Sequence, residues 1–274
     1  MVAEFDRTFD QKGTPGAQIK EMRRELRAQV KERRNEMTPE SRRLKSQQVC
    51  ERLLGLLDGI VEQERARGVG ASCDMSRSIN LGVYSAFAEE LDLGLLIEGA
   101  FERGVTVSFP CMMHDARCCQ GSCEQTMEFR AVSFDDYALT KKTLAGKGST
   151  RKLAAEEEER GVSFLLHPLR RYHHADPELD QLPYVPADEL DLLVCPCVAF
   201  DGKGNRLGYG AGNYDRYLTQ FRYRGIGLDG GIDDATAGLS AFEACCIVGV
   251  AFEEQRVGSI PVEEHDIPLP FVSA

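Results

Sequence analysis

A glycine-rich segment flanked by arginines is the part of this sequence best equipped for chemistry. It follows an apolar stretch and reads Arg206-Leu207-Gly208-Tyr209-Gly210-Ala211-Gly212-Asn213-Tyr214-Asp215-Arg216. Its alternating glycines lack Cβ atoms, so the backbone can adopt positive φ angles and approach a ligand closely. Successive N–H groups of such a loop, and the start of a helix behind it, attract anions. The arginines add charge suited to phosphate or carboxylate, and Asp215 could hold Mg²⁺ as a hard oxygen ligand.

Two common phosphate-binding motifs do not fit this loop. The dinucleotide fingerprint G-x-G-x-x-G fails because the third glycine comes one residue early, at Gly212. The P-loop pattern G-x₄-G-K-[ST] is supplied neither by residues 146–148 nor by residues 202–204. Spacing alone therefore leaves two interpretations open, an anion site and an ordinary surface loop.

The overall charge narrows the class of ligand. The chain has 274 residues and carries 33 Lys and Arg against 44 Asp and Glu, which gives a net charge of −11. A protein with this negative net charge repels polyanions, which disfavours nucleic acid and anionic membranes as partners. No apolar run approaches the roughly 18 residues of a membrane span. We therefore expect a monomeric protein with small-molecule ligands, whose anionic groups are held by a local basic site.

The N-terminal residues and the ten cysteines bear on the compartment and on metal binding. The start of the chain carries acids and lacks the apolar core of a secretory signal, so we expect a cytoplasmic protein with reduced thiols, an organellar location being left open. Four cysteines gather around His114, namely Cys111, Cys118, Cys119 and Cys123. Zinc is conceivable there, but the spacing lacks a paired C-x₂-C pattern and favours a surface insertion with free thiols. The cysteines of apolar segments are expected in the core: Cys195, Cys197, Cys245 and Cys246.

The elements that must position the glycine loop alternate between strands and helices. Helices are expected from Ile19, after Thr38-Pro39, over residues 91–103 and over residues 214–221. Strands are expected over residues 79–84, 105–110, 127–132, 190–196 and 246–252. This order predicts an α/β fold, a single domain with a mostly parallel twisted sheet and helices on both faces in a three-layer, Rossmann-like arrangement. Ligands of such sheets bind beyond the carboxyl ends of the strands, where the glycine loop lies.

The domain is expected to span residues 19–274, after a flexible tail over residues 1–18. Charged, cysteine-rich or glycine-rich stretches interrupt the pattern, and we expect insertions near residues 62–78, 111–126, 145–165 and 225–241.

The first helix carries both an apolar stripe and basic residues. Met22, Leu26 and Val30 recur every four residues, which predicts one face that anchors the helix to the body. Arg23 and Arg27 share a neighbouring face because they are also four residues apart. Lys20 and Arg24 have the same spacing, and a solvated basic face is the simplest interpretation of either pair.

The order of these motifs resembles the signature of the 5-formyltetrahydrofolate cyclo-ligase family. The loop fits as Asn-Arg-Leu-Gly-Tyr-Gly-x-Gly-x-Tyr-Asp-Arg over residues 205–216, preceded by Pro-x-Val-Ala-Phe-Asp over residues 196–201. The basic helix fits at residues 23–27, Glu90-Leu91-Asp92-Leu93 follows a strand, and the C-terminal motif Pro-x-x-x-His-Asp ends at Asp266. The likeness covers about residues 19–272 between the expected insertions.

The resemblance implies an activity that uses ATP and Mg²⁺ as cofactors. Members convert 5-formyltetrahydrofolate to 5,10-methenyltetrahydrofolate and release ADP and phosphate. The formyl oxygen is phosphorylated to an iminophosphate, the N10 amine attacks the activated carbon, and phosphate leaves. The work of such an enzyme is positioning and charge stabilisation. Two other hypotheses stay open: a folate- or nucleotide-binding homologue without turnover, and a phosphometabolite isomerase or transferase on a related α/β fold.

The resemblance also implies roles for residues of this sequence. Arg206, Tyr209 and Asp215 would act in catalysis, and Asp215 and Asp266 would hold the metal. ATP would contact Arg23, Arg27, Arg206, Leu207, Gly208, Tyr209, Gly210, Ala211, Gly212, Asn213 and Tyr214. The folate substrate would contact Ser85, Glu90, Tyr209, Gly210, Ala211, Gly212 and Asn213. Cys197 replaces a glycine that is usual in the family, and the family's Gly-Ile-x-Glu-Pro segment is not recognisable, its place being taken by His167-Pro168.

Overall fold

One mixed sheet organises the computed structural model, which describes residues 15–68, 77–87, 89–114, 125–146, 161–221, 223–224 and 245–274. Within these residues nine strands form the sheet, in the order β11-β10-β6-β1-β2-β3-β5, with β4 added to β2 and β9 to β10. Their bounds are β1 Asn80–Gly82, β2 Thr106–His114, β3 Gln125–Ala131, β4 Arg171–Tyr172, β5 Tyr184–Val185, β6 Leu192–Pro196, β9 Tyr223–Arg224, β10 Cys245–Val250 and β11 Phe271–Ser273. All pairs are parallel except those that β3 makes with β2 and β5.

The central strands are apolar along their whole length because both faces of the sheet are covered. In β6, Leu192 and Val194 belong to one hydrophobic cluster, whereas Leu193 and Cys195 belong to another on the opposite face. Every residue of β10 is buried as well. The predicted strands at residues 190–196 and 246–252 are therefore confirmed, with ends shifted by one or two residues.

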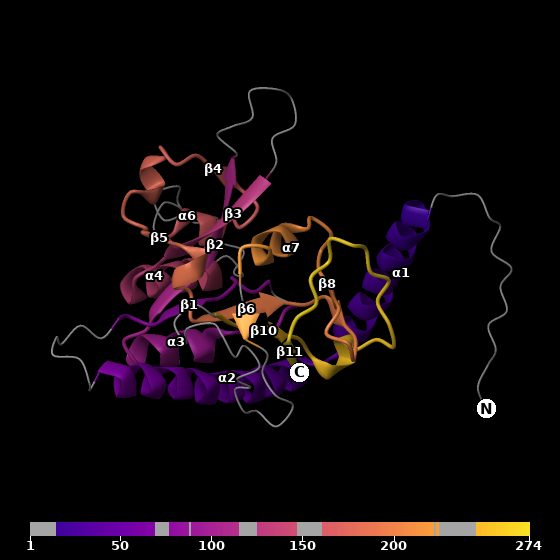
Figure 1. Ribbon diagram of the computed structural model, residues 1–274, viewed down its shortest axis with the longest axis horizontal. Coiled ribbons are helices and arrows are strands. Elements are labelled where there is room, and N and C mark those ends of the chain that lie inside the picture. Colours follow the sequence, from indigo (N-terminus) through magenta and orange to yellow (C-terminus); the bar gives the residue numbers. More distant parts are fainter. Residues whose placement is uncertain are drawn as a thin grey trace, which may run out of the picture.

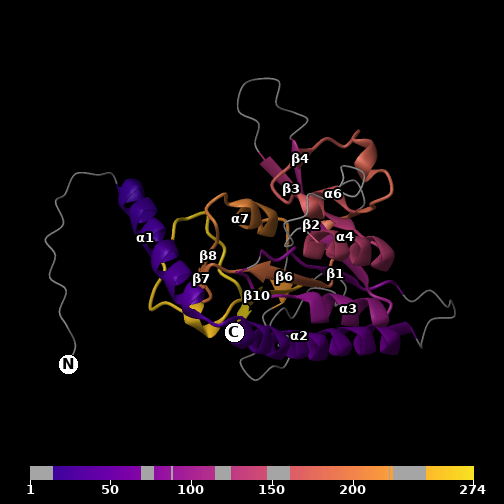
Figure 2. The same cartoon turned by 180° about the vertical axis from the view of Figure 1, so that it is seen from behind.

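Helices lie on both faces, as the α/β prediction requires. The α-helices are α1 Pro15–Glu36, α2 Pro39–Gly68, α3 Gly94–Glu102, α4 Phe134–Gly146, α6 Ser163–Leu166 and α7 Asn213–Leu218; short 3₁₀ turns are η1 Pro177–Leu179, η2 Ala187–Glu189 and η3 Glu253–Gln255. Figures 1 and 2 show α2 and α3 side by side along one face, with α7 on the other. The α2 side chains Val49, Leu53 and Leu57 fill the first cluster, whereas α7 gives Tyr217 and Leu218 to the second.

Helix α1 lies apart from α2 and packs on a small antiparallel hairpin, β7 Ala199–Phe200 with β8 Arg206–Leu207. Val30 is buried against this hairpin and Leu26 packs beside it. The predicted stripe is only partly correct, because Met22 is 51% exposed and lies beyond the reach of the hairpin cluster. The start of α2 is confirmed, since the Ser41 N–H donates to Thr38 Oγ1 at 3.1 Å.

The hairpin turn is locked by two residues that carry no catalytic signal. Asp201 is buried and accepts from the N–H groups of Lys203, Asn205 and Ile260, which fixes the turn and ties it to the C-terminal segment. Gly204 has φ +78°, and a Cβ there would overlap the Leu269 carbonyl oxygen. Glycine is therefore required for the close approach of the two segments.

Several boundaries differ from the sequence predictions. Helix α1 begins at Pro15, inside the predicted tail, and α2 continues to Gly68, inside the first predicted insertion. Strand β2 continues to His114 because its alternating side chains are buried on both faces of the sheet. The remaining parts of the four predicted insertions fall almost entirely outside the described residues, which end at 68, 114, 146 and 224 and resume at 77, 125, 161 and 245.

The cysteine predictions have two outcomes. Cys195, Cys197, Cys245 and Cys246 are buried, as expected. Cys111 also lies in the core, on β2, where burial raises the pKa of its thiol to about 12. Cys118, Cys119 and Cys123 lie outside the described residues. In the described part of the chain no three His, Cys, Asp or Glu side chains are grouped as for a metal, and no helix has the length and apolar character to cross a membrane.

Candidate functional site

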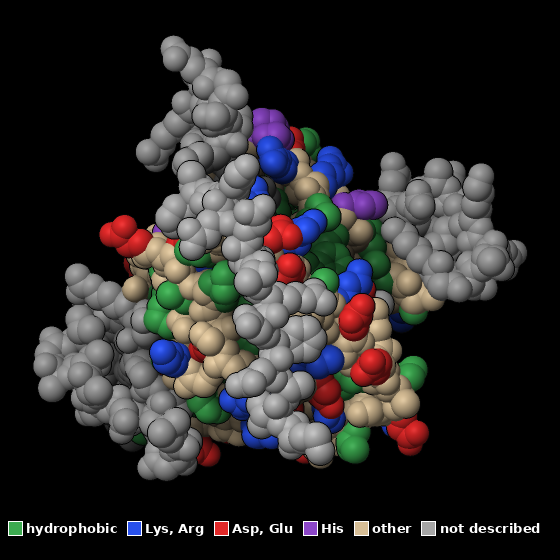
Figure 3. Space-filling model, turned by 90° about the vertical axis from the view of Figure 1, so that its right-hand side faces the viewer, with side chains coloured by type: hydrophobic (Ala, Val, Ile, Leu, Met, Phe, Trp, Pro, Cys, Tyr) green, Lys and Arg blue, Asp and Glu red, His purple; other side chains and the backbone are tan. Residues whose placement is uncertain are grey.

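A cavity of about 660 Å³ opens at the carboxyl ends of β1 and β6, between α1, the glycine loop and the β2–β3 hairpin. Figure 3 faces this side of the molecule, where hydrophobic side chains line a hollow beside mixed basic and acidic groups. All the residues with predicted roles line this one cavity: Arg23, Arg27, Ser85, Glu90, the loop Arg206–Asp215, and Asp266. The structure thus brings together residues from both ends and the middle of the chain.

A buried ion pair lies behind the glycine loop. Arg206, at the start of β8, donates to Asp215 Oδ1 on α7 at 2.8 Å, and its guanidinium is 3% exposed. It also lies over the Tyr214 ring, 5.4 Å from the centroid. Burial is the largest influence on Arg206 and lowers its pKa, but Asp215, together with the nearby Cys195, Cys197 and Tyr214, raises the pKa on balance. Arg206 Nε and the Tyr214 hydroxyl are buried and have no hydrogen-bond partner among the described residues.

The basic face of α1 reaches the same loop through Arg27. Arg27 Nε donates to the Gly208 carbonyl oxygen at 2.8 Å. Gly210 has φ +104°, and a Cβ there would meet the Arg27 guanidinium at 3.3 Å. Gly208 does not have the positive φ that was expected; its missing Cβ instead leaves room for the Arg206 guanidinium. The glycines therefore let two arginines approach the loop backbone.

The basic residues on α1 differ in their partners. Arg23 donates to the Pro261 carbonyl oxygen at 2.9 Å, to Glu263 at 3.0 Å and to Asp266. Arg24 is 76% exposed, and among the described residues its salt bridge is with Glu21 on its own helix. Arg23, Arg27 and also Lys20 line the cavity, whereas Arg24 does not.

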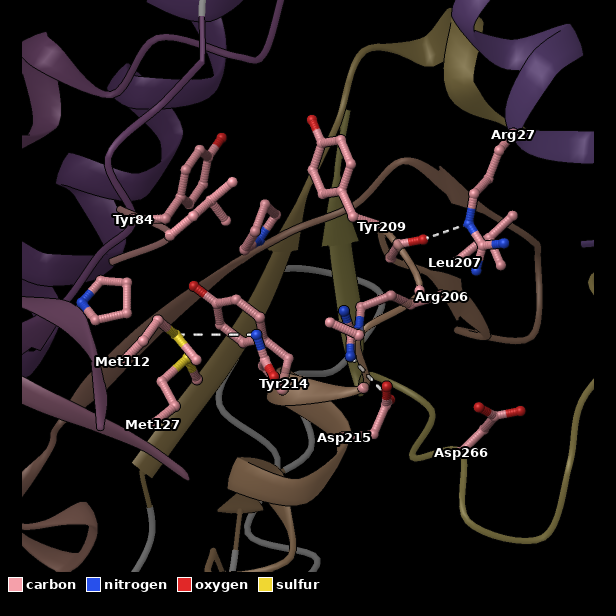
Figure 4. Close-up of a pocket in the computed structure, with 18 of the residues that line it drawn as sticks. Arg27, Tyr84, Met112, Met127, Arg206, Leu207, Tyr209, Tyr214, Asp215 and Asp266 are labelled. Carbon is pink, nitrogen blue, oxygen red and sulfur yellow. Dashed lines mark hydrogen bonds and ion pairs between the residues drawn. The ribbon is translucent and has the colours of Figure 1, made fainter. Parts of the chain in front are cut away.

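Two carboxylates in the cavity have the chemistry that Mg²⁺ prefers. Asp215 pairs with Arg206 and Asp266 pairs with Arg23, and both line the same cavity although they are remote in sequence. Figure 4 shows both carboxylates on the side of the site where Arg206 lies. Protein-bound Mg²⁺ usually takes one or two carboxylates and completes its shell with water and substrate phosphates. Asp215 and Asp266 fit that donor set.

The opposite side of the cavity contains one half-buried carboxylate, Glu90. Glu90 accepts from the Tyr209 hydroxyl at 2.8 Å with Oε1 and from the Phe87 N–H at 2.8 Å with Oε2. Burial raises the pKa of Glu90, and the two hydrogen bonds only partly oppose this shift. Glu90 precedes α3, whose first residue is Gly94, so it is not an acid in the first turn of that helix.

Sequence reasoning missed the apolar wall around this carboxylate. Met112, Met127, Phe164 and Leu169 line the cavity, and Figure 4 shows both methionines opposite the arginines. Phe164 and Leu169 come from the middle third of the chain, where no contacts were predicted. Met112 was recoverable in principle, because the alternation of β2 turns it away from Cys111 and toward the loop, where the Asn213 amide contacts its sulfur.

Comparisons with known proteins agree on one family. The model of the 5-formyltetrahydrofolate cyclo-ligase family matches residues 19–274. The 5-formyltetrahydrofolate cyclo-ligase of Haemophilus influenzae is 36% identical over 94 residues, which are 34% of this chain and 40% of that protein. The protein of the same name from Escherichia coli K12 is 38% identical over 97 residues, 35% of this chain and 43% of that protein. These alignments span about two fifths of the length of the curated relatives.

One solved structure supports the fold independently. A 5,10-methenyltetrahydrofolate synthetase from Mycoplasma pneumoniae superposes with a TM-score of 0.50 and 13% identity, covering 91% of this chain and 96% of that one. At that identity the likeness concerns the fold alone. It agrees with a single α/β domain.

Proposed function

Because the chain belongs to the 5-formyltetrahydrofolate cyclo-ligase family, we propose that it converts 5-formyltetrahydrofolate to 5,10-methenyltetrahydrofolate in an ATP- and Mg²⁺-dependent reaction. The reaction would release ADP and phosphate and pass through a phosphorylated formyl group, the iminophosphate. We further propose that the protein acts on these small molecules as a monomer in the cytoplasm, without nucleic acid or membrane partners. The net charge of −11 supports the absence of polyanionic partners.

The observation that carries the proposal is the division of one cavity into two unlike halves. We call the part lined by Arg23, Arg27, Arg206, Asp215 and Asp266 the phosphate half, and the part lined by Glu90, Met112, Met127, Phe164 and Leu169 the folate half. The glycine loop lies between them, since Arg27 contacts it from one side and Glu90 from the other. Two ligands bound there would meet at the loop.

The phosphate half supports binding of a polyphosphate and stabilisation of charge. Arg27 and Arg206 present fixed positive charge beside the loop, and the low exposure of Arg206 strengthens its electrostatic effect. Asp215 and Asp266 would hold Mg²⁺, which neutralises charge on phosphate oxygens when it is bound. Arg23 would keep Asp266 and the C-terminal segment in place through its three contacts.

The folate half supports recognition of a flat, partly polar ring. The ionised Glu90 carboxylate can accept two N–H donors such as those of a pterin, and the sulfur and aromatic side chains around it suit a ring face. Phosphorylation forms a bond between the formyl oxygen and the transferred phosphorus and breaks the bond to ADP. Attack by N10 on the activated carbon then closes the ring, phosphate leaves with the formyl oxygen, and N10 gives up its proton to the departing phosphate or to water. The chain contributes alignment of the reacting atoms at the loop.

The test is a direct assay of product formation. Protein, MgATP and 5-formyltetrahydrofolate are mixed, and the absorbance of 5,10-methenyltetrahydrofolate is followed, with reactions lacking ATP or containing a chelator as controls. The proposal predicts a rise only in the complete mixture. No rise at high protein concentration, with both ligands still binding by calorimetry, would establish the folate- or nucleotide-binding homologue instead.

A further inference from the structure

Arg34 is a buried cation to which the proposed function gives no role. It follows Arg27 by seven residues and therefore lies on nearly the same side of α1. Its side chain is 4% exposed, and its Nε is buried with no hydrogen-bond partner in the described part of the chain. Burying a guanidinium is costly unless negative charge surrounds it. The neighbours of Arg34 should therefore explain why it is there.

Those neighbours belong to the folate half. Arg34 Nη2 lies 4.0 Å from Oε2 of Glu89, the residue before Glu90. The positive charge of Arg34 also acts on Glu90 and on the Tyr209 hydroxyl. Glu90 and Tyr209 are themselves joined by the 2.8 Å hydrogen bond that closes the folate half against the glycine loop. Arg34 thus lies beside the contact on which the folate half depends.

The charge of Glu90 decides what this carboxylate can bind. When it is ionised it accepts hydrogen bonds at both oxygens, whereas protonation turns one oxygen into a donor. Burial raises the pKa of Glu90; the Phe87 N–H, the Tyr209 hydroxyl and the charge of Arg34 each lower it again. Among these three, Arg34 alone brings a full positive charge.

The other titratable groups that face Glu90 do not replace Arg34. They are Glu89 in the same turn, Tyr84 after β1, Cys197 after β6, Tyr209 in the glycine loop and Tyr214 on α7. Burial raises the pKa of the three phenols and of the Cys197 thiol, so all four are neutral near pH 7. Glu89 is negative and works against ionisation of Glu90.

We propose that Arg34 is a positioning residue of the folate half, which keeps Glu90 charged and in contact with Tyr209 so that Glu90 can accept two N–H donors of the pterin. This rests on the proposed function, because it takes the pterin as the ligand of Glu90. Arg34 acts through Glu90 and needs no contact with either ligand.

The test compares R34Q with R33Q. Arg33 is the neighbour of Arg34 on α1, and its side chain donates to the Arg256 carbonyl oxygen. In R34Q the KM for 5-formyltetrahydrofolate should rise about tenfold, as when a charge-assisted interaction is lost, with the KM for ATP unchanged. The acidic limb of kcat/KM for the folate should move to higher pH, since removal of the positive charge raises the pKa of Glu90. R33Q should leave both quantities unchanged.

Two further variants separate positioning from a purely structural role. R34K keeps the positive charge, so the acidic limb of its pH profile should lie close to that of the wild-type protein. If R34Q does not fold, R34K decides the question, and an acidic limb displaced in R34K overturns the proposal. When Glu90 is already replaced in E90Q, the additional change R34Q should not move the acidic limb of the pH profile. Equal increases of both KM values in R34Q, with an unshifted acidic limb, would show that Arg34 only supports the fold.

Calorimetric binding of 5-formyltetrahydrofolate without ATP distinguishes failure of this proposal from failure of the proposed function. A wild-type protein without turnover would contradict the proposed function alone. The role of Arg34 would then be decided by binding: R34Q should weaken folate binding more at pH 5.5 than at pH 8, and an equal or absent loss at both would overturn it.

Discussion

The phosphate half of the cavity is held by ion pairs, whereas the folate half is an apolar wall around one carboxylate. Arg23 joins α1 to the C-terminal Asp266, and Arg206 joins β8 to Asp215. In the folate half Glu90 has two neutral donors and a positive charge behind it. On the proposed function, the phosphate half would exchange partners when an anion binds, whereas the folate half would have to keep a half-buried carboxylate charged.

This difference would explain how a chain of net charge −11 could hold the proposed anionic ligands. Arg23 and Arg206 of the phosphate half are paired with acids that also suit Mg²⁺, so their positive charge is local and matched. On the proposed function, selectivity for the organic substrate would rest on the folate half. The predictions below test this division, beginning with the largest expected effect.

Removing the buried charge of the phosphate half should have the largest effect. In Arg206→Met, Asp215 loses its partner inside the fold, so the free energy of unfolding should fall by about 3 kcal/mol. Turnover should drop by at least about a hundredfold because a preorganised charge is lost. Urea denaturation and the product assay measure the two effects.

The control is the exposed pair of Lys141 with Glu98, at 2.6 Å. Lys141→Met should change the free energy of unfolding by less than about 1 kcal/mol, since solvent screens such pairs. Equal losses of stability in the two variants would contradict the claim that the Arg206–Asp215 pair stabilises the fold more than an exposed pair does.

The proposed metal ligands should give a smaller effect that depends on Mg²⁺. Asp215→Asn keeps the size of the side chain but removes its charge, so the Mg²⁺ concentration for half-maximal rate should rise at least about tenfold. Asp188→Asn, exposed in η2, should leave it unchanged. A titration in which the two variants behave alike would remove Asp215 from the metal site.

The hydroxyl that bridges the halves should matter least. Tyr209→Phe removes the hydrogen bond to Glu90 but leaves the ring against Phe87, at 6.0 Å between centroids. One neutral donor contributes about 1 kcal/mol, so folate affinity should fall about fivefold. The loss should be larger at low pH, because removal of the Tyr209 hydroxyl raises the pKa of Glu90 and leaves less of it ionised. ATP affinity should stay the same. A larger loss for ATP than for folate would show that Tyr209 belongs to the phosphate half.

The parts of the fold with a strong local pattern could be predicted from the sequence. Leu192–Cys195 is a continuous apolar run because both its faces are buried, and Thr38 marks the start of α2 through its own side chain. Strand β2 was predicted too short, since Pro110 and Cys111 disguise its alternation. The two-residue strands β4 and β5 carry too few residues for any pattern.

The site was predicted where one segment carries the chemistry and missed where the fold assembles it. The glycine loop is contiguous, so its residues were recognised from spacing and resemblance. The contacts of Arg23 join residues 238 to 243 positions apart, which no periodicity reveals. Burial of Arg34 could not be foreseen either, because its neighbours on α1 are mostly exposed cations and acids.

The most direct test of the two-half account measures each ligand separately by calorimetry in Arg27→Ala and Glu90→Gln. Arg27→Ala should weaken ATP binding about tenfold, the loss of a charge-assisted contact, and leave 5-formyltetrahydrofolate binding unchanged. Glu90→Gln should weaken 5-formyltetrahydrofolate binding and leave ATP binding unchanged. Arg24 is not among the residues that line the cavity, so Arg24→Ala should change neither affinity. Equal weakening of both ligands in both variants would contradict the division of the cavity on which the account rests.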